Sequence, residues 1–182
     1  DYKKDYLRFK KEYDAAWESV NMRGDLILRK DIEEFEQRLA EYVGTKYAVA
    51  VSNGTDAIYL AIKSLGIEHE GNVVLPSHTF KSTCGAVINA GLEPLLVDMD
   101  GSPKNYFPDV WMPVHIAGEL WSTQIPEDSN YTIEDAAQAF GAVKNPTSTA
   151  QTWSFYPAKI LGCKGDAGAV TTNDLQVYEY IK

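Results

Sequence analysis

The feature that most constrains the fold of this chain is a series of short apolar segments after Gly44, rich in β-branched residues and separated in places by helical stretches. We expect helices at residues 55–65, at residues 80–90 and over the last ten residues. Continuous apolar strands that alternate with helices are typical of a largely parallel sheet with both faces covered, and therefore of an α/β domain. The expected strands are residues 47–51, 72–75, 94–97, 111–114, 131–133, 150–155 and 168–172.

The segment before Gly44 has a different pattern. Its apolar residues recur at helical spacing over residues 3–20, and Gly24 follows as a helix breaker. A second helix is expected to begin with Asp31 as its N-cap and to end at Gly44. The sequence therefore predicts an N-terminal helical arm at residues 1–30, followed by one α/β domain at residues 31–182.

Polar and aromatic residues follow the predicted strands where each strand ends. In open parallel sheets, ligands bind at the carboxyl ends of the strands, which meet at one edge. We therefore expect these residues to share one site. They include Asn53, Gly54, Thr55, Phe80, His115, Glu134, Asp135 and Lys159.

The segment SNGTDAIYLAI, at residues 52–62, places a glycine and a hydroxyl residue at the start of a predicted helix. Backbone N–H groups and the positive end of the helix dipole at such a position suit a phosphate group. The alternative is an ordinary strand-to-helix turn that is capped by Thr55 or Ser52.

Two more segments carry groups that suit a flat ligand. Phe80 in PSHTFKST, at residues 76–83, can stack on a planar ring, or it can pack in the core as most phenylalanines do. A buried carboxylate such as Asp135, in IEDAAQAFGA at residues 133–142, needs a cationic or hydrogen-bonding partner. A protonated ring nitrogen would serve, and helix capping by Asp135 is the alternative.

Lys159 lies in SFYPAKILG, at residues 154–162, among apolar and small residues. Such surroundings favour the neutral amine, which attacks carbonyl carbons, and a Schiff base with pyridoxal phosphate is a well-known use of it. A loop lysine that extends to water is the alternative, and Lys164 is a second candidate. Pyridoxal phosphate requires a Schiff-base lysine, a carboxylate for its ring nitrogen, a stacking ring and a phosphate site, and this chain offers each of them.

Together these segments resemble the DegT/DnrJ/EryC1/StrS family, whose members are fold-type-I aminotransferases that use pyridoxal phosphate and act mostly on nucleotide-linked keto-sugars. The resemblance extends from about Gly24 to the end of the chain and rests on SNGTDAI, PSHTFKST, IEDAAQAFGA and SFYPAKILGCKGDAGAVTTND. It implies that residues 31–182 are the cofactor-binding large domain, with a mostly parallel sheet covered by helices.

The resemblance implies two catalytic residues, which also bind the cofactor. Lys159 would form the Schiff base and later move the proton at the substrate carbon. Asp135 would keep the ring nitrogen protonated. Related sugar dehydratases carry histidine in place of the lysine, so Lys159 favours transamination from L-glutamate to a nucleotide-linked keto-sugar.

The resemblance also implies further residues that bind pyridoxal 5′-phosphate without a metal. Phe80 would stack on the ring, and Gln138 would lie near the ring hydroxyl. The phosphate would be held by Gly54, Thr55 and Ser154.

Family members are typically about twice as long as this chain, which is far more than one ordinary domain. We therefore expect the large domain to be incomplete and the small C-terminal domain to be absent. A fragment, a split enzyme and a naturally reduced form all remain open.

Two alternative functions remain beside transamination. One is a non-catalytic relative that keeps the fold and binds the cofactor or a sugar nucleotide without turnover. The other is a different reaction of the same cofactor, such as that of a lyase.

Charge and composition bear on partners and location. The chain has 26 acidic and 17 basic residues and a net charge of −9, which argues against nucleic-acid binding. No signal peptide or long apolar span is visible, so we expect a cytoplasmic protein without a membrane partner. Cys84 and Cys163 are expected to be free thiols.

Because sites in this family form between two subunits, the resemblance implies a homodimer, with a second chain as a possible source of the missing half.

Overall fold

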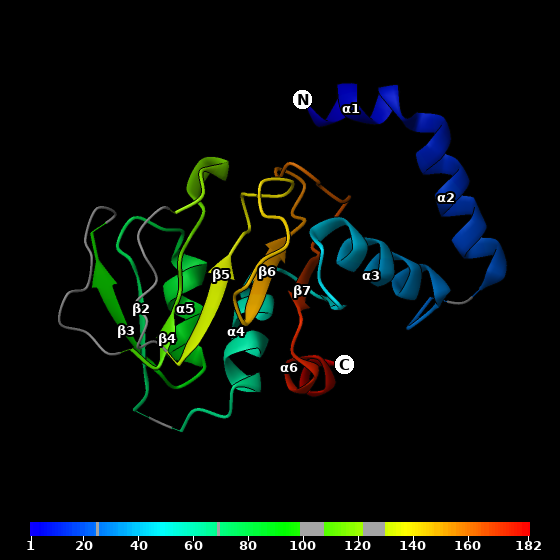
Figure 1. Ribbon diagram of the computed structural model, residues 1–182. Coiled ribbons are helices and arrows are strands. Elements are labelled where there is room, and N and C mark those ends of the chain that lie inside the picture. Colours follow the sequence, from blue (N-terminus) through cyan, green and yellow to red (C-terminus); the bar gives the residue numbers. More distant parts are fainter. Residues whose placement is uncertain (25, 69, 99–107, 122–129) are drawn as a thin grey trace. The chain divides into compact units, whose positions relative to one another are not determined.

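The computed structural model describes residues 1–24, 26–68, 70–98, 108–121 and 130–182 of the chain (Figure 1). They form two compact units, Asp1–Glu34 and Phe35–Lys182.

The smaller unit is helical, and the predicted arm lies within it. The expected helix over residues 3–20 is divided at Phe9 into α1 (Tyr2–Arg8) and α2 (Lys10–Arg23), and Gly24 ends α2 in the left-handed region with a φ of 67°. The helix α3 (Lys30–Val43) starts before Asp31, so Asp31 is not its N-cap. The Asp31 carboxylate instead lies in the first turn, where the helix dipole favours negative charge, and it forms an ion pair with Arg23.

The larger unit contains the sheet, and the prediction of an α/β fold with a mostly parallel sheet is confirmed. The strand order is β1-β7-β6-β5-β4-β2-β3. Neighbours pair in parallel from β6 to β3, while β7 is antiparallel to both β6 and β1. The strands are β1 (Tyr47–Val51), β2 (Asn72–Pro76), β3 (Glu93–Val97), β4 (Val110–Trp111), β5 (Tyr131–Asp135), β6 (Ala150–Ser154) and β7 (Gly168–Thr172).

The strand β4 is shorter than the predicted run over residues 111–114. Pro113 has no N–H group and cannot donate to a strand ladder, so regular pairing stops before it. Pairing resumes as a single parallel bridge between Val114 and Asp135. The chain therefore leaves β4 close to the end of β5, which brings His115 to the same sheet edge as Asp135.

Helices cover both faces of the sheet (Figure 1). One face packs against α4 (Gly54–Ser64), α5 (Lys81–Asn89) and α6 (Leu175–Ile181). Their apolar residues, among them Ile58, Ile62, Val87 and Val177, share a core with Leu75 and other strand residues.

The opposite face packs against the part of α3 from Phe35 onward, which belongs to the larger unit. Leu39 and Val43 share a second core with Trp153 and Phe155. Gly44 then ends α3 as expected, with a φ of 89°. A sheet held between two cores fixes its strand ends rigidly, and side chains at those ends are placed with little freedom.

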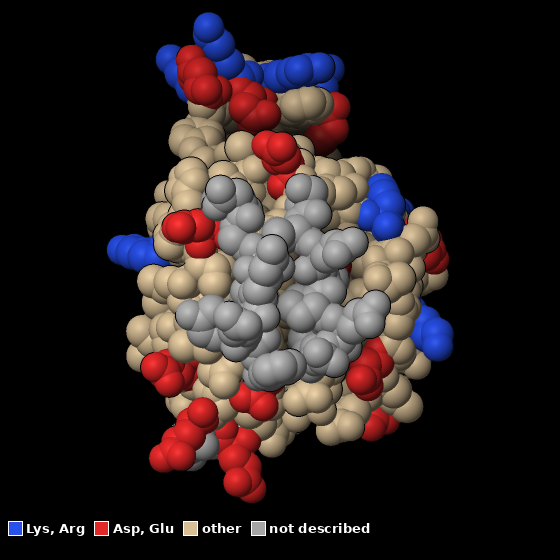
Figure 2. Space-filling model, turned by 60° about the vertical axis from the view of Figure 1, so that its left-hand side comes forward, with Lys and Arg blue, Asp and Glu red and all other residues tan. Residues whose placement is uncertain are grey.

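Acidic side chains outnumber basic ones on the face of the larger unit that Figure 2 shows. Lys and Arg lie singly among the residues described on this face, in agreement with the net charge of −9. In the described ranges, no helix combines the length and the apolar character needed to cross a bilayer.

Candidate active site

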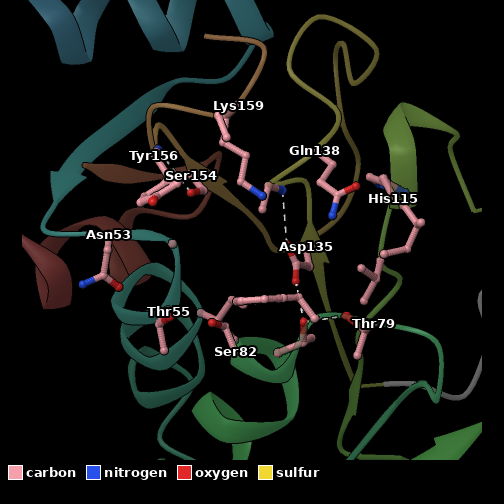
Figure 3. Close-up of a pocket in the computed structure, with 18 of the residues that line it drawn as sticks. Asn53, Thr55, Thr79, Ser82, His115, Asp135, Gln138, Ser154, Tyr156 and Lys159 are labelled. Carbon is pink, nitrogen blue, oxygen red and sulfur yellow. Dashed lines mark hydrogen bonds between the residues drawn. The ribbon is translucent and has the colours of Figure 1, made fainter. Parts of the chain in front are cut away.

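A cavity of about 940 Å³ lies at the carboxyl ends of the strands. This volume is near the upper end of the range for small-molecule sites, about 300–1,000 Å³. Its lining comes from the segments that follow β1, β2, β4, β5 and β6, as the parallel topology requires. The structure brings all seven predicted site residues into this lining, and their individual roles remain predictions. They are Gly54, Thr55, Phe80, Asp135, Gln138, Ser154 and Lys159. Figure 3 labels Thr55, Asp135, Gln138, Ser154 and Lys159.

The N-terminus of α4 forms one wall of the cavity. Its N-cap is Asn53, not Ser52 or Thr55, and the Asn53 side chain accepts a 2.9 Å hydrogen bond from the backbone N–H of Asp56. The first helical hydrogen bond runs from the Ala57 N–H to the Asn53 carbonyl, at 3.0 Å. The N–H groups of Gly54 and Thr55 precede this bond and therefore suit an anion.

Gly54 lets this helix end approach β6 closely. A Cβ atom added at Gly54 would lie 2.8 Å from the Cβ atom of Ser154, closer than side chains tolerate. The glycine thus brings the donors of α4 and the hydroxyl of Ser154 to one corner of the cavity. Such a corner offers the donors that a phosphate group needs.

Asp135 ends β5 and is 5% exposed. Its Oδ2 atom accepts a hydrogen bond of 2.8 Å from the Thr83 hydroxyl, and its Oδ1 atom accepts one of 3.1 Å from the Ala137 N–H. Burial raises the pKa of this carboxyl, against the opposing effects of these two hydrogen bonds, of the Lys159 charge and of the nearby His115 ring. Turns follow Asp135 in place of a helix, so the helix-capping alternative is wrong.

Lys159 lies on the segment after β6 and is half-buried. Its backbone N–H donates to the Tyr156 carbonyl at 2.8 Å, which holds a turn there. Figure 3 shows its side chain reaching into the cavity that Asp135 also faces, and its charge acts on the Asp135 carboxyl. Lys164, the second candidate, is exposed and is not part of the cavity lining.

Gln138 is held by a backbone donor. Its Oε1 atom accepts a 2.8 Å hydrogen bond from the N–H of Ala117, a residue of the short 3₁₀ turn η1 (Ile116–Gly118) with a φ of 55°. The amide nitrogen therefore points the other way, into the cavity (Figure 3). Gln138 thus offers a donor to a ligand oxygen.

Phe80 is 60% exposed at the start of α5, so the alternative of a core phenylalanine is wrong. Its ring contributes to the lining of the cavity. An exposed aromatic ring beside a polar cavity is suited to stack on a planar ligand.

The sequence predictions missed several lining residues. His115 was expected at this sheet edge without a role, and it does line the cavity, whereas Glu134, expected at the same edge, does not. Thr79 and Thr83 lie in the PSHTFKST segment, yet no role was assigned to them. The partner of Thr83 is Asp135, 52 positions away, so only the tertiary structure reveals the contact.

The donor set of this cavity fits a phosphate-bearing, planar ligand with a protonated nitrogen. Backbone N–H groups and a hydroxyl meet at the end of α4, and an exposed ring lies nearby. A buried carboxylate, held by neutral donors, faces the cavity together with a lysine amine. These are the groups that bind such a cofactor and hold it covalently.

Comparisons with known proteins agree with this chemistry. Residues 8–182 match the DegT/DnrJ/EryC1/StrS aminotransferase family. The chain is 35% identical to the UDP-2-acetamido-2-deoxy-3-oxo-D-glucuronate aminotransferase of Pseudomonas aeruginosa, over 96% of this chain and 54% of that protein. It is 34% identical to the dTDP-3-amino-3,4,6-trideoxy-alpha-D-glucose transaminase of Streptomyces venezuelae, over 100% of this chain and 54% of that protein.

The crystal structure of S. venezuelae DesV in complex with a ketimine intermediate has a similar fold. It superposes with a TM-score of 0.85 at 32% identity, over 100% of this chain and 54% of DesV. The chain therefore spans about half the length of the relatives that it matches.

Proposed function

The chain belongs to the DegT/DnrJ/EryC1/StrS aminotransferase family, and we propose that it transfers an amino group from L-glutamate to a nucleotide-linked keto-sugar. Its fold is that of the large domain of fold-type-I transferases that use pyridoxal phosphate. Pyridoxal 5′-phosphate is the cofactor of these aminotransferases. The relatives are nucleotide-sugar aminotransferases, which supports sugar transamination as the reaction class.

The observation that most supports the proposal is that Lys159 and Asp135 face one cavity beside the N-terminus of α4. The two residues are separated in sequence and lie on different segments. Both follow parallel strands whose carboxyl ends meet at one edge of the sheet, which supports a shared role in binding this cofactor.

When bound, pyridoxal phosphate supplies a ring that accepts electrons from the substrate carbon. Lys159 would hold the cofactor through its Nζ atom, and its amine would move a proton to and from the substrate carbon. Asp135 would accept a hydrogen bond from the ring nitrogen and stabilise the positive charge there. The Gln138 amide nitrogen would donate to the ring oxygen, and Phe80 would stack on the ring.

The phosphate corner orients the cofactor. The N–H groups of Gly54 and Thr55, at the positive end of α4, bind the phosphate together with the hydroxyl of Ser154. The close packing of Gly54 on Ser154 holds these donors on rigid elements. The cofactor is thereby fixed at two ends, by the phosphate corner and by Asp135.

A binding function without turnover is the second candidate. Among the described residues of the lining, Lys159 is the only Lys or Arg. Glutamate and nucleotide sugars both carry anionic groups, which are usually bound by cationic side chains. The described lining offers backbone N–H and hydroxyl donors for the cofactor phosphate but no cationic side chain besides Lys159 for these two substrates, which favours cofactor binding without turnover.

We also propose that the chain forms a homodimer. Exposed apolar side chains, including Phe80, Tyr156 and Ile160, lie in the lining of the cavity, which is open enough to leave them in water. Covering them would stabilise an assembly. Light scattering after gel filtration measures the mass, and a monomer at every concentration would contradict this part of the proposal.

An absorbance titration tests the proposed function. Wild-type protein should bind pyridoxal phosphate saturably and develop a visible absorbance band, which L-glutamate should then convert to that of the amine form. Lys159→Ala should lose the band, and Lys164→Ala, the matched control outside the lining, should keep it. A band that glutamate leaves unchanged would support binding without turnover, and no band at all would contradict both functions that use the cofactor.

A further inference from the structure

A chain of two hydroxyl groups leads to the Asp135 carboxylate. Thr83 on α5 is fully buried, and its Oγ1 atom lies 2.8 Å from Oδ2 of Asp135. Thr79, in the turn before α5, places its Oγ1 atom 2.7 Å from the Oγ1 atom of Thr83. Thr79 and Thr83 both contribute to the cavity lining (Figure 3).

The protonation of the carboxylate determines the direction of this chain. An ionised carboxylate only accepts hydrogen bonds, so the Thr83 hydroxyl must donate to Asp135. The oxygen of Thr83 is then left to accept from the Thr79 hydroxyl. Both hydroxyl protons therefore point toward Asp135, and this orientation stabilises its ionised form.

The two oxygen atoms of Asp135 are held from two directions. Thr83 on α5 holds Oδ2, while the Ala137 N–H in the turn after β5 holds Oδ1. One bond to each oxygen fixes the plane of the carboxylate. The remaining acceptor positions are then available on the cavity side.

We propose that Thr83 is a positioning residue that orients the Asp135 carboxylate and keeps it ionised for the ring nitrogen of the cofactor, with Thr79 orienting the Thr83 hydroxyl. This inference rests on the cofactor-binding role proposed for Asp135. It assigns to α5 a function beyond covering the sheet.

The electrostatic surroundings explain why Asp135 needs such support. Burial raises the pKa of its carboxyl, and the Thr83 hydrogen bond is the largest opposing effect, ahead of Ala137, Lys159 and His115. The ring of His115 is engaged elsewhere, because its Nδ1 atom accepts from the Trp121 N–H and its Nε2 atom bonds to Glu134. Loss of the Thr83 hydroxyl should therefore raise the Asp135 pKa further.

Two substitutions separate positioning from simple packing. Thr83→Val keeps the size and shape of the side chain but loses the hydroxyl, while Thr83→Ser keeps the hydroxyl and loses a methyl group. If the hydroxyl orients Asp135, Thr83→Val should weaken cofactor binding and Thr83→Ser should retain it. If Thr83 only fills space, Ser is the more harmful change. Thr172→Val is a matched control, because Thr172 is buried and donates to the Thr149 carbonyl outside the cavity lining.

The first measurement is the affinity for pyridoxal phosphate by absorbance titration. Thr83→Val should bind about ten- to a hundredfold more weakly, as expected for a lost hydrogen bond to a charged group. Thr83→Ser and Thr172→Val should stay within about threefold of wild type. Thr79→Val should weaken binding by less than Thr83→Val, and it provides a second test if Thr83→Val does not fold.

The second measurement needs no cofactor. Urea unfolding of the cofactor-free protein from about pH 5 to about pH 8 reports the protonation of Asp135. The folded state binds more protons than the unfolded state when a carboxyl pKa is raised by folding, so stability falls as the pH rises. In Thr83→Val the free energy of unfolding should fall more steeply with pH, so the loss of stability relative to wild type should grow as the pH rises. When Thr83→Val is made in the Asp135→Asn variant, the loss of stability that it causes should not depend on pH. The loss caused by Thr172→Val should not depend on pH either.

These measurements distinguish failure of the inference from failure of the proposed function. If wild type does not bind the cofactor, the proposed function fails, and the unfolding series still decides whether Thr83 keeps Asp135 ionised. If wild type binds and Thr83→Val binds equally well, with a deficit in stability that is constant with pH, the inference is overturned.

Discussion

Glu134 and Asp135 are neighbours on β5, but their carboxylates have different surroundings. Glu134 accepts hydrogen bonds from the Ser148 hydroxyl and from His115, whose Nε2 atom lies 3.1 Å away. Asp135 has two neutral donors, a hydroxyl and a backbone N–H, and its remaining acceptor positions face the cavity. Successive residues of a strand point to opposite faces, which separates the two networks.

The difference shows how a structural acid can be distinguished from a functional one. The network of Glu134 is closed, because His115 and Ser148 are themselves held by Trp121 and Gln151. Asp135 is more deeply buried than Glu134, yet it lacks a directly bonded cation among the described residues. An ionised, buried carboxylate without a cationic partner lowers the stability of the folded protein unless a ligand supplies the positive charge.

Replacement of Asp135 gives the largest expected effect. Asp135→Asn should reduce amine exchange about a hundredfold or more, because the ring nitrogen loses its charged partner. The free energy of urea unfolding at about pH 8 should not decrease, since a neutral amide is easier to bury than a carboxylate. Single-turnover absorbance changes with glutamate, together with urea unfolding, measure the two effects. A variant that is inactive only because it is unstable would contradict this assignment.

Replacement of Glu134 should show the reverse pattern. Glu134→Ala leaves the His115 and Ser148 donors without their acceptor and should lower the free energy of unfolding by about 2 kcal/mol. Affinity of the folded variant for pyridoxal phosphate should remain within about threefold of wild type, a change of well under 1 kcal/mol. Urea unfolding and an absorbance titration check this prediction. A large loss of affinity with unchanged stability would show that the two acids are not separate in function.

The pH dependence of stability should show a smaller effect. Because burial raises the pKa of Asp135, the folded protein holds this proton to higher pH than the unfolded chain, and ionisation at higher pH costs stability. The stability of Asp135→Asn relative to wild type should therefore rise with pH, by on the order of 1 kcal/mol for each unit of pKa shift. Unfolding curves of the cofactor-free proteins measure it. Parallel pH profiles for the two proteins would contradict a raised pKa.

Much of the fold could be predicted from local sequence. The apolar runs at residues 47–51 and 168–172 coincide with β1 and β7, because buried strands are encoded by continuous apolar residues. The predicted helices at residues 55–65 and 80–90 correspond to α4 and α5 within one residue at each end. Strand-end position predicted that Gly54, Thr55, Phe80, Asp135 and Lys159 share one cavity, whereas Gln138 and Ser154 were predicted from the family resemblance.

The remaining features depend on contacts between distant residues or on fine details of the turns. The length of β4 depends on Pro113 and on where β5 can pair with it. The N-cap of α4 is Asn53, although the nearby hydroxyl residues Ser52 and Thr55 are of types that also cap helices well. The hydroxyl chain to Asp135 and the network of Glu134 require α5 and the 115–121 segment to be in place, and no local pattern encodes them.

The most direct test of the account is to locate the covalent bond to the cofactor. The protein is mixed with pyridoxal phosphate, reduced with borohydride, digested and analysed by mass spectrometry. The account predicts a single modified lysine at Lys159, in wild type and in Glu134→Ala alike, and much weaker labelling in Asp135→Asn. Labelling of Lys164 in place of Lys159, or labelling spread over surface lysines, would contradict it.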